Sequence, residues 1–258
     1  MTLMSLRDTK SKPGWKHDQL AERFNTHKAM DEIHPDAAVN IYVGWPTFFE
    51  QIKYQAEFLG KQKLNILDFG CGAGEFCNNL HMKGHMVVGI DRSEAMLNIA
   101  KANSDHSITF CLKELVDSGE ECSIYHNQMD VVTAIHSFDW NENIEEIIRQ
   151  LTGFLVPNGL LIFAVFPKEH VIESLKIKDL FEDFDSEENP TKGICNFDGI
   201  KVPVFIKEPS YYDAIFKKLN YSKVLEFYPQ YPKSFLTKYK WTGALAPEMV
   251  ILAYRRGK

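Results

Sequence analysis

The chain has 258 residues, which leaves room for one large domain or two small ones. Its residues are 45% hydrophobic and 25% charged, as is typical of a globular protein. A net charge of −6 weighs against a nucleic-acid partner, because nucleic-acid-binding surfaces cluster Lys and Arg. No apolar run approaches about 18 residues and the N-terminus has no apolar signal core, so we expect no membrane partner and no secretory signal.

The first 60 residues carry scattered aromatic and polar side chains, and residues 14–60 predict a helical segment. From residue 64 onward, short apolar runs alternate with amphipathic stretches, as strands alternate with helices. The predicted strands are 64–69, 86–91, 108–112, 130–135 and 160–165, the predicted helices are 75–83, 94–103 and 141–154, and Pro157-Asn158-Gly159 predicts a turn.

The alternation loosens after residue 166. The predicted elements there are a helix within 168–184, a hairpin over 196–202 with Asp198-Gly199 at its turn, a helix over 210–219, and strands over 221–228 and 248–254. We interpret residues 1–258 as one domain made of a helical N-terminal segment (14–60), a core (61–166), an insertion (167–207) and a final part of the sheet (208–258).

Near-continuous apolar strands that alternate with helices predict an α/β fold. Its sheet should be doubly wound, mostly parallel and covered by helices on both faces. Ligand sites in such folds lie outside the carboxyl ends of the strands, near a topological switch point. We therefore expect the functional residues in the loops that follow the predicted strands.

A glycine-rich loop, Gly70-x-Gly72-x-Gly74, separates the first predicted strand from the helix that follows it. Glycines permit a tight turn and a close approach of backbone to ligand, and the helix start offers free N–H groups. A dinucleotide also suits this pattern, but its fingerprint has glycine at the sixth position, where this chain has Glu75. Glu75 and Asp68 would repel a pyrophosphate, whereas the sulfonium and ammonium groups of S-adenosylmethionine are cations that carboxylates tolerate or attract.

The stretch Leu67-Asp68-Phe69-Gly70-Cys71-Gly72-Ala73-Gly74 strongly resembles the class I S-adenosylmethionine-dependent methyltransferases. The resemblance covers residues 60–166 well. It implies a Rossmann-like sheet of seven strands, the cofactor S-adenosyl-L-methionine and the product S-adenosyl-L-homocysteine. It also implies that Asp68 orients the loop and the amino group of the cofactor, and that Asp91 binds both ribose hydroxyls. An ionised carboxylate suits the second role, because it accepts two O–H donors.

Further cofactor contacts are implied by the same resemblance. Arg92 and the stretch 93–97 resemble the start of the family's second helix. Glu114 stands near the position of an acid that reads the adenine amino group, and Leu115 is its adenine-packing neighbour. The complete set of predicted cofactor-binding residues is Asp68, Gly70, Cys71, Gly72, Gly74, Asp91, Arg92, Met96, Glu114, Leu115, Ile135 and His136.

The fourth predicted strand runs into His136-Ser137-Phe138-Asp139-Trp140, the segment that faces the acceptor in the family. A base with a near-neutral pKa assists methyl transfer to a hydroxyl group, and histidine is the natural candidate. His136 is therefore predicted to be the catalytic base or a substrate-orienting group; the alternative is that it packs against the cofactor. Asp139 either supports His136 or caps the helix that follows.

The resemblance to small-molecule methyltransferases implies that the aromatic N-terminal segment folds over the cofactor as a lid. Tyr42 and Trp45 in the N-terminal segment, with Trp140 after the fourth strand, are candidates for a substrate lid. Arg23 is a candidate partner for a carboxylate, and the insertion 167–207 is a second candidate cover. The alternative is that most of these aromatic side chains pack on the sheet at helical spacing.

The five cysteines are odd in number and irregular in spacing, and none forms a C-x-x-C pair. We therefore expect free thiols in a reducing compartment, hence a cytoplasmic protein, and no metal site. The residues are Cys71, Cys77, Cys111, Cys122 and Cys195.

The predicted function is methyl transfer to a small-molecule acceptor by in-line displacement, in which the protein aligns the nucleophile, the methyl group and the leaving sulfur. The chain has no Pro-Pro-Tyr type motif after the fourth strand and no Pro-Cys pair. In this fold, the first absence disfavours methylation of exocyclic or amide nitrogens in nucleic acids and proteins, and the second disfavours methylation of cytosine C5. Two alternatives stay open: an RNA or protein methyltransferase, and a cofactor-binding relative without transfer activity. The sequence predicts neither the oligomeric state nor the acceptor.

Overall fold

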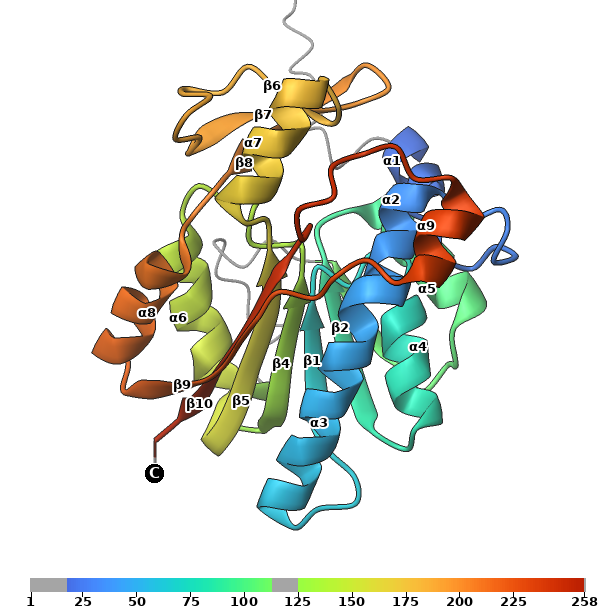
Figure 1. Ribbon diagram of the computed structural model, residues 1–258. Coiled ribbons are helices and arrows are strands. Elements are labelled where there is room, and N and C mark those ends of the chain that lie inside the picture. Colours follow the sequence, from blue (N-terminus) through green and yellow to red (C-terminus); the bar gives the residue numbers. More distant parts are fainter. Residues whose placement is uncertain (1–17, 113–124, 258) are drawn as a thin grey trace, which may run out of the picture.

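The computed structural model describes residues 18–112 and 125–257, and seven strands form its main sheet (Figure 1). These strands are β1 (Asn65–Phe69), β2 (Met86–Asp91), β3 (Thr109–Leu112), β4 (Met129–Ile135), β5 (Leu155–Val165), β9 (Tyr221–Phe227) and β10 (Val250–Arg256). Their order is β3-β2-β1-β4-β5-β10-β9. Strands β1 to β5 pair in parallel, and β10 runs antiparallel to both β5 and β9. The predicted α/β fold with a mostly parallel seven-stranded sheet is confirmed.

The strand order reverses between β1 and β4, which pair directly. From β1 the chain adds β2 and β3 on one side, and it then returns to add β4 and β5 on the other. Asp68 on β1 lies in register with Thr133 on β4. This switch point brings the glycine loop after β1 beside the His136 segment after β4, as expected for a ligand site in an open α/β sheet.

Helices cover both faces of the main sheet (Figure 1). One face packs against α3 (Trp45–Leu59), α4 (Glu75–Met82) and α5 (Glu94–Asn103), and the other packs against α6 (Ile144–Phe154) and α8 (Pro209–Lys218). Along β1, Ile66 contributes to the first layer and its neighbour Leu67 to the second. This alternation follows from the two-residue period of a strand, and it explains why the strands read as continuous apolar runs.

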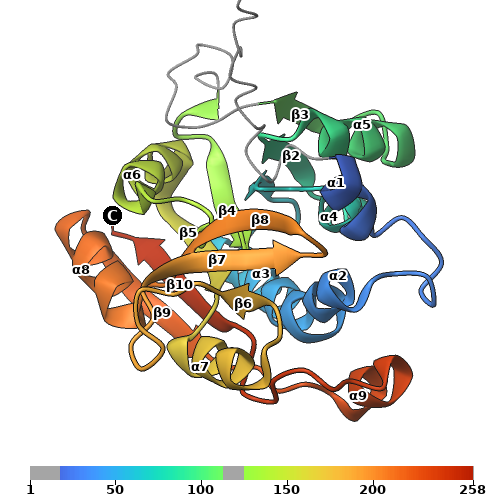
Figure 2. The same ribbon diagram turned by 90° about the horizontal axis from the view of Figure 1, so that it is seen from above.

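A smaller unit covers one end of the main sheet (Figures 1 and 2). It consists of α7 (Lys168–Ile177) and an antiparallel sheet of β6 (Phe181–Glu182), β7 (Lys192–Phe197) and β8 (Ile200–Phe205). The predicted hairpin is confirmed, because Asp198 and Gly199 have φ angles of 51° and 92° in the turn between β7 and β8. The N-terminal helices α1 (Asp18–Arg23) and α2 (Pro35–Val39) lie at the same end of the molecule.

A π-helical turn, Asn40–Gly44, joins α2 directly to α3. Pro46 stands in the first turn of α3 and has no backbone N–H, so the regular hydrogen-bond ladder is interrupted just before it. Gly44 packs closely under Met249, whose Sδ would lie 3.1 Å from an added Cβ. The junction places Asn40 and Trp45 at the cavity described below.

The helix predicted within 168–184 is confirmed; it ends at Ile177, where Lys178 adopts a φ of 54°, and the chain then forms the short strand β6. Another predicted helix has a wrong start. Helix α6 begins at Ile144 rather than at 141, because Asn141 closes a turn by donating its backbone N–H to the Phe138 carbonyl. A local turn therefore overrides the apolar pattern at this helix start.

Two other features differ from the prediction. The expected turn at Pro157-Asn158-Gly159 lies within β5 as an irregularity, where Asn158 has a φ of 63° and the pairing register with β4 shifts. Helix α9 (Lys233–Tyr239) has no counterpart among the predicted elements, because seven residues give little helical periodicity. Among the described residues, no helix combines the length and the apolarity needed to cross a bilayer.

Candidate functional site

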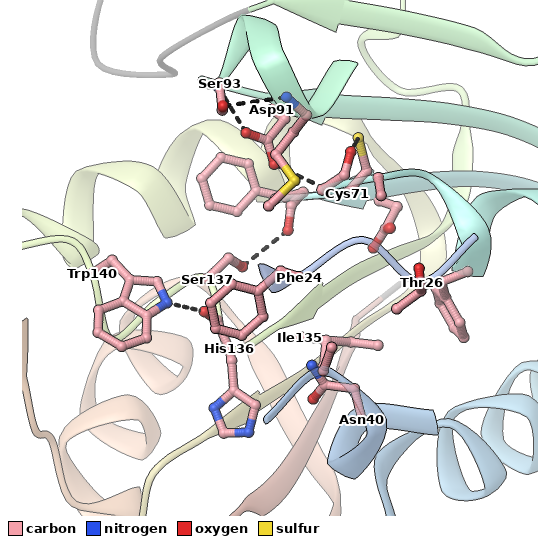
Figure 3. Close-up of a pocket in the computed structure, with 18 of the residues that line it drawn as sticks. Phe24, Thr26, Asn40, Cys71, Asp91, Ser93, Ile135, His136, Ser137 and Trp140 are labelled. Atoms are coloured by element: carbon pink, nitrogen blue, oxygen red, sulfur yellow. Dashed lines mark hydrogen bonds between the residues drawn. The ribbon is translucent and has the colours of Figure 1, made fainter. Parts of the chain in front are cut away.

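A cavity of about 250 Å³ opens where the carboxyl ends of β1, β2 and β4 meet the N-terminal segment and the insertion. In the view of Figure 3, Asp91 and Ser93 lie at one end of this cavity and the imidazole of His136 lies at the opposite end, with Phe24 and Ser137 between them. The glycine loop, the end of β2 and the residues after β4 therefore contribute to one site, as the strand order requires.

Most of the predicted site residues line this cavity. They are Asp68, Gly70, Cys71, Gly72, Asp91, Arg92, Met96, Ile135, His136, Trp45 and Trp140. Gly74 instead packs behind the loop, where an added Cβ would meet Ala100 at 2.8 Å and the Phe110 ring at 2.9 Å. Tyr42 packs against Phe235 and Tyr239 of α9 and does not line the cavity. Glu114 and Leu115 lie outside the described residues.

The glycine loop has a left-handed backbone at each of its glycines, with φ angles of 75° at Gly70, 53° at Gly72 and 83° at Gly74. A Cβ added to Gly70 would lie 2.5 Å from the Cβ of Ser137, so the loop approaches the β4 segment too closely for a side chain. A Cβ added to Gly72 would meet nothing within 4 Å. The loop is therefore fixed by packing at Gly70 and open at Gly72.

Asp68 is a buried carboxyl group at the end of β1. The Thr133 hydroxyl donates a hydrogen bond to its Oδ1 at 2.7 Å, and the Cys77 thiol lies 3.5 Å from its Oδ2. Burial raises the pKa of Asp68 to about 6, against the opposing effect of these two hydrogen bonds. Asp68 thus presents a carboxyl group that a nearby cation would favour in its ionised form.

Asp91 ties the end of β2 to the glycine loop. Its Oδ2 accepts the Gly72 N–H at 2.8 Å, and its Oδ1 accepts the Ser93 N–H at 2.8 Å. Burial raises the pKa of the Asp91 carboxyl group, and these two backbone hydrogen bonds oppose the rise. Ser93 in turn caps α5 by accepting the Met96 N–H, so Asp91 and Met96 are held in fixed positions relative to the loop.

His136 follows β4 with a left-handed backbone, φ 46°, which is uncommon for a residue with a side chain. Its Nδ1 lies 3.5 Å from Oδ2 of Asp139, and its ring packs on Phe166 with centroids 4.3 Å apart. The indole of Trp140 donates a hydrogen bond to the His136 carbonyl. His136 Nε2 is buried and has no hydrogen-bond partner among the described residues. The imidazole is thus oriented through Nδ1 and has Nε2 available.

Asp139 is the group that orients His136. Its side chain is fully buried, and both of its carboxylate oxygens accept the Phe166 N–H at 3.3 Å. Burial raises the pKa of Asp139, opposed by the hydrogen bond and charge of His136. The alternative prediction that Asp139 caps α6 is wrong, since the N-cap residue of that helix is Asn143.

The structure adds cavity residues that the sequence analysis does not single out. Glu248 reaches the cavity from the segment before β10, and the Tyr231 hydroxyl donates to its Oε2 at 2.8 Å. Asn40, from the π-helical turn, has a buried Oδ1 with no partner among the described residues. Phe166 enters from the end of β5. No motif marks these positions, because they come from distant segments that only the fold brings together.

The N-terminal segment and the insertion meet beside the cavity. Arg23 on α1 donates from Nε and Nη2 to Oδ2 of Asp36, at 3.0 and 2.8 Å, and from Nη1 to Asp198 in the β7–β8 turn. The rings of Phe24 and Phe197, which both line the cavity, pack edge-to-face with centroids 5.4 Å apart. These contacts join the N-terminal segment to the insertion beside the cavity.

The charge of the cavity wall is strongly acidic. Its described residues include five carboxyl groups and one guanidinium, that of Arg92, which lies 3.4 Å from the Trp140 carbonyl. The carboxyl groups are Asp36, Asp68, Glu75, Asp91 and Glu248. In the described part of the chain, no three His, Cys, Asp or Glu side chains are placed to hold a metal ion.

Two curated relatives match about half of this chain. One is a ubiquinone biosynthesis O-methyltransferase of Histophilus somni (strain 2336), 27% identical over 123 residues, which are 46% of this chain and 51% of that protein. The other is a malonyl-[acyl-carrier protein] O-methyltransferase of Bacillus anthracis, 28% identical over 116 residues, which are 43% of this chain and 41% of that protein. The chain thus spans about half the length, or less, of these relatives.

Solved structures share the fold over most of the chain. An S-adenosylmethionine-dependent methyltransferase from Mesorhizobium loti superposes with a TM-score of 0.58 at 18% identity, covering 75% of this chain and 91% of that one. Magnesium protoporphyrin IX methyltransferase from Synechocystis PCC 6803, with bound S-adenosylmethionine, superposes with a TM-score of 0.55 at 16% identity. The match covers 93% of this chain and 98% of that one. The family model described as a methyltransferase domain matches residues 47–200, more than half of the chain. The chain therefore belongs to the methyltransferase-domain family.

Proposed function

We propose that this protein transfers a methyl group from S-adenosyl-L-methionine to a small-molecule acceptor by in-line displacement, releasing S-adenosyl-L-homocysteine. One observation carries this proposal: the acidic glycine loop with Asp91 and the oriented imidazole of His136 occupy the two ends of one cavity. Such a cavity suits a cationic cofactor at one end and an acceptor at the other. Family membership supports the same reaction.

The cofactor end of the cavity fits S-adenosylmethionine in shape and charge. Gly72 leaves open space where a side chain would stand, so backbone can approach a ligand there. The carboxyl groups of Asp68 and Asp91 are buried, and burial raises the pKa of both, although the charge of Arg92 acts in the opposite direction on Asp91. A cationic ligand would stabilise their ionised forms. We assign the ribose hydroxyls to Asp91 and the amino group to Asp68. Met96 and Ile135 supply apolar wall.

The acceptor end of the cavity fits proton removal. The bound cofactor supplies a methyl group already activated by a cationic sulfur, so the protein needs mainly to align the acceptor. His136 Nε2 is positioned to accept the proton that the acceptor loses, and Asp139 holds the imidazole through Nδ1. Trp45 and Trp140 line the cavity and would exclude water from the acceptor.

An RNA methyltransferase and a protein without transfer activity are disfavoured by separate observations. An RNA methyltransferase needs a basic groove beside the acceptor, whereas the described wall of this cavity carries one guanidinium and five carboxyl groups. A cofactor-binding protein without transfer activity has no need for a buried, oriented His136. We further propose a cytoplasmic location, since the four cysteines among the described residues are free thiols.

Calorimetric titration with S-adenosylhomocysteine tests the cofactor site, and labelled S-adenosylmethionine with a metabolite extract tests the transfer. Asp91→Ala should weaken S-adenosylhomocysteine binding by roughly 1–3 kcal/mol through loss of the ribose hydrogen bonds. Asp105→Ala, an exposed carboxylate outside the cavity, is the matched control. Absence of binding by the wild type would overturn the proposal. Binding without any labelled product would favour the non-methylating alternative.

A further inference from the structure

We infer that the end of the cavity beside His136 binds a small aromatic molecule that carries a positively charged amino group. This inference rests on the proposed function, because it names the class of acceptor for the same site. The reasons lie in the charges, the unpaired polar atoms and the aromatic walls at that end of the cavity.

Carboxyl groups outnumber basic groups near Glu248. Asp36 and Asp179 lie close enough to Glu248 for their charges to raise the pKa of its carboxyl group. Of these, Asp36 pairs with the guanidinium of Arg23, which also pairs with Asp198. No ion pair between described residues includes Glu248, and the charge of His136 acts against the two carboxylates. A cationic ligand would correct this imbalance.

The carboxyl group of Glu248 is held in place for such a ligand. The Tyr231 hydroxyl donates to Oε2 at 2.8 Å, and the ring of Tyr231 packs against both Phe235 and Trp241, at centroid distances of 5.5 and 5.4 Å. None of the hydrogen bonds between described residues engages Oε1. Burial raises the pKa of Glu248 to about 7, with the nearby charge of His136 acting in the opposite direction. A bound ammonium group would favour the ionised form further.

Two polar atoms at the His136 end of the cavity can accept hydrogen bonds from a ligand. Asn40 Oδ1 and His136 Nε2 are both buried without a partner among the described residues, and both residues line the cavity. The His136 side chain is 10% exposed, and Nε2 is an acceptor when the Nδ1 proton points to Asp139. An ammonium group has three N–H donors and no acceptor, whereas a carboxylate has no donor. An ammonium group can therefore donate to Asn40 Oδ1, which a carboxylate cannot, and His136 Nε2 stays available for the hydroxyl group of the acceptor.

Aromatic rings form the remaining wall. Phe166 packs on His136 and edge-to-face on Trp140, with centroids 4.3 and 5.8 Å apart, and Phe24 and Phe197 close the side towards the insertion. Aromatic faces hold an aromatic body and also attract a cation. The guanidinium of Arg23 already lies 5.7 Å from the centroid of the Phe197 ring. The wall therefore suits both parts of the inferred ligand.

Three phenols of similar size and different charge test this inference on the full chain. Tyramine carries an ammonium group, 4-ethylphenol is neutral, and 3-(4-hydroxyphenyl)propanoate carries a carboxylate. Binding is measured by calorimetry at pH 7.5, with and without saturating S-adenosylhomocysteine. We expect tyramine to bind the wild type at least about ten-fold more tightly than the propanoate, with the neutral phenol in between.

Variants then assign the preference to Glu248. We expect Glu248→Gln to weaken tyramine binding about ten-fold and to leave 4-ethylphenol unchanged, while the exposed Glu57→Gln, with the same change in net charge, alters neither. The inference is overturned if tyramine binds the wild type no more tightly than the propanoate does, or if neither compound binds. Either result holds regardless of how the variants behave. If the wild type does not bind S-adenosylhomocysteine, the proposed cofactor site is contradicted instead. The three phenols, compared in the absence of S-adenosylhomocysteine, still decide the class of acceptor.

Discussion

His136 Nδ1 and Asp139 Oδ2 lie 3.5 Å apart in a turn where Asp139 is fully buried and His136 has a left-handed backbone. A buried carboxylate that faces one imidazole nitrogen fixes the ring tautomer and leaves the other nitrogen as a base. The pair therefore acts as a unit in the proposed reaction: His136 meets the acceptor and Asp139 positions His136.

Asp139→Asn should lower kcat about 10- to 100-fold, because the amide has nearly the same shape but favours the wrong tautomer of His136. His136→Ala should lower kcat at least as much. The affinity for S-adenosylhomocysteine should change less than about two-fold in both variants, since neither residue is assigned to the ribose or the amino group. Steady-state kinetics with the acceptor found by labelling, together with calorimetry, give both quantities.

A merely structural role for Asp139 would give a different result. If Asp139 only accepted the hydrogen bond from the Phe166 N–H, Asp139→Asn would lower thermal stability and cofactor affinity together. The pH profile of kcat would then not change. If Asp139 orients the base, the profile of kcat against pH should shift in Asp139→Asn while the melting temperature stays within a few degrees.

Gly70 and Gly72 provide a matched pair of substitutions in the cofactor loop. Alanine at Gly72 faces only the strain of a positive φ, about 1–2 kcal/mol, because its Cβ meets nothing within 4 Å. Alanine at Gly70 has similar strain and a Cβ 2.5 Å from that of Ser137, which adds about 1–3 kcal/mol of overpacking. Urea denaturation should therefore rank Gly70→Ala as clearly less stable than Gly72→Ala.

The two glycine variants should also separate stability from binding. The Cβ of Gly72→Ala extends into open space on the cavity wall, so S-adenosylhomocysteine affinity should fall more than stability does. Equal destabilisation by the two variants, or unchanged affinity in Gly72→Ala, would contradict the packing described for this loop.

Local signals in the sequence were enough to predict that the residues we assign to the cofactor lie together. Asp68, Gly72 and Asp91 stand at strand ends or in a short loop, and the parallel order of β1 and β2 brings them together. Ser93 begins the stretch that resembles the start of the family's second helix, and its hydroxyl caps that helix by accepting the third N–H. Short-range patterns of this kind survive folding, since their geometry is set within a few residues.

The acceptor end was less predictable, for a physical reason. Asn40, Phe166 and Glu248 come from a π-helical turn, a strand end and a loop before β10, which are far apart in the chain. Glu248 and its partner Tyr231 are also separated by α9, a helix too short to show a periodic pattern. Tyr42 shows the reverse error, because an aromatic residue expected at the lid packs on α9 instead.

Asp68→Asn should stabilise the cofactor-free protein at neutral and alkaline pH. The pKa of Asp68 is raised from 3.8 to about 6 in the folded protein, so its contribution to stability is present below about pH 4 and is lost as the pH rises through 6. A rise of about 2 units in the pKa of Asp68 lowers the free energy of unfolding by about 3 kcal/mol at pH 8. Asparagine avoids this cost and keeps an acceptor for the Thr133 hydroxyl.

Thermal unfolding across pH checks this sign. The melting temperature of Asp68→Asn should exceed that of the wild type by several degrees at pH 8, and the gap should shrink as the pH falls from 7 to 4.5. The same variant should bind S-adenosylhomocysteine more weakly, since the carboxylate assigned to the amino group is gone. A gap that widens at low pH would show that burial of Asp68 is not the cause.

Arg23 should control how fast the cofactor leaves the cavity. Its guanidinium joins Asp36 in the N-terminal segment to Asp198 in the hairpin turn, and the neighbouring rings Phe24 and Phe197 line the cavity. The Asp198 side chain is 85% exposed, so its ion pair contributes little, whereas the Arg23–Asp36 pair is largely buried. Arg23→Ala should therefore raise the dissociation rate of S-adenosylhomocysteine several-fold, and Asp198→Asn should raise it less.

Stopped-flow dissociation and hydrogen exchange over residues 18–24 and 192–205 measure these effects. The control is Lys201→Ala on the same hairpin, whose ion pairs with Glu182 and Asp183 stay within the insertion and do not reach α1. We expect Arg23→Ala to show faster dissociation of S-adenosylhomocysteine and faster hydrogen exchange in both segments. We expect Lys201→Ala to show neither change. Faster exchange without faster dissociation would mean that α1 and the hairpin meet without covering the cofactor, and unchanged rates in Arg23→Ala would mean that the aromatic contacts alone hold them together.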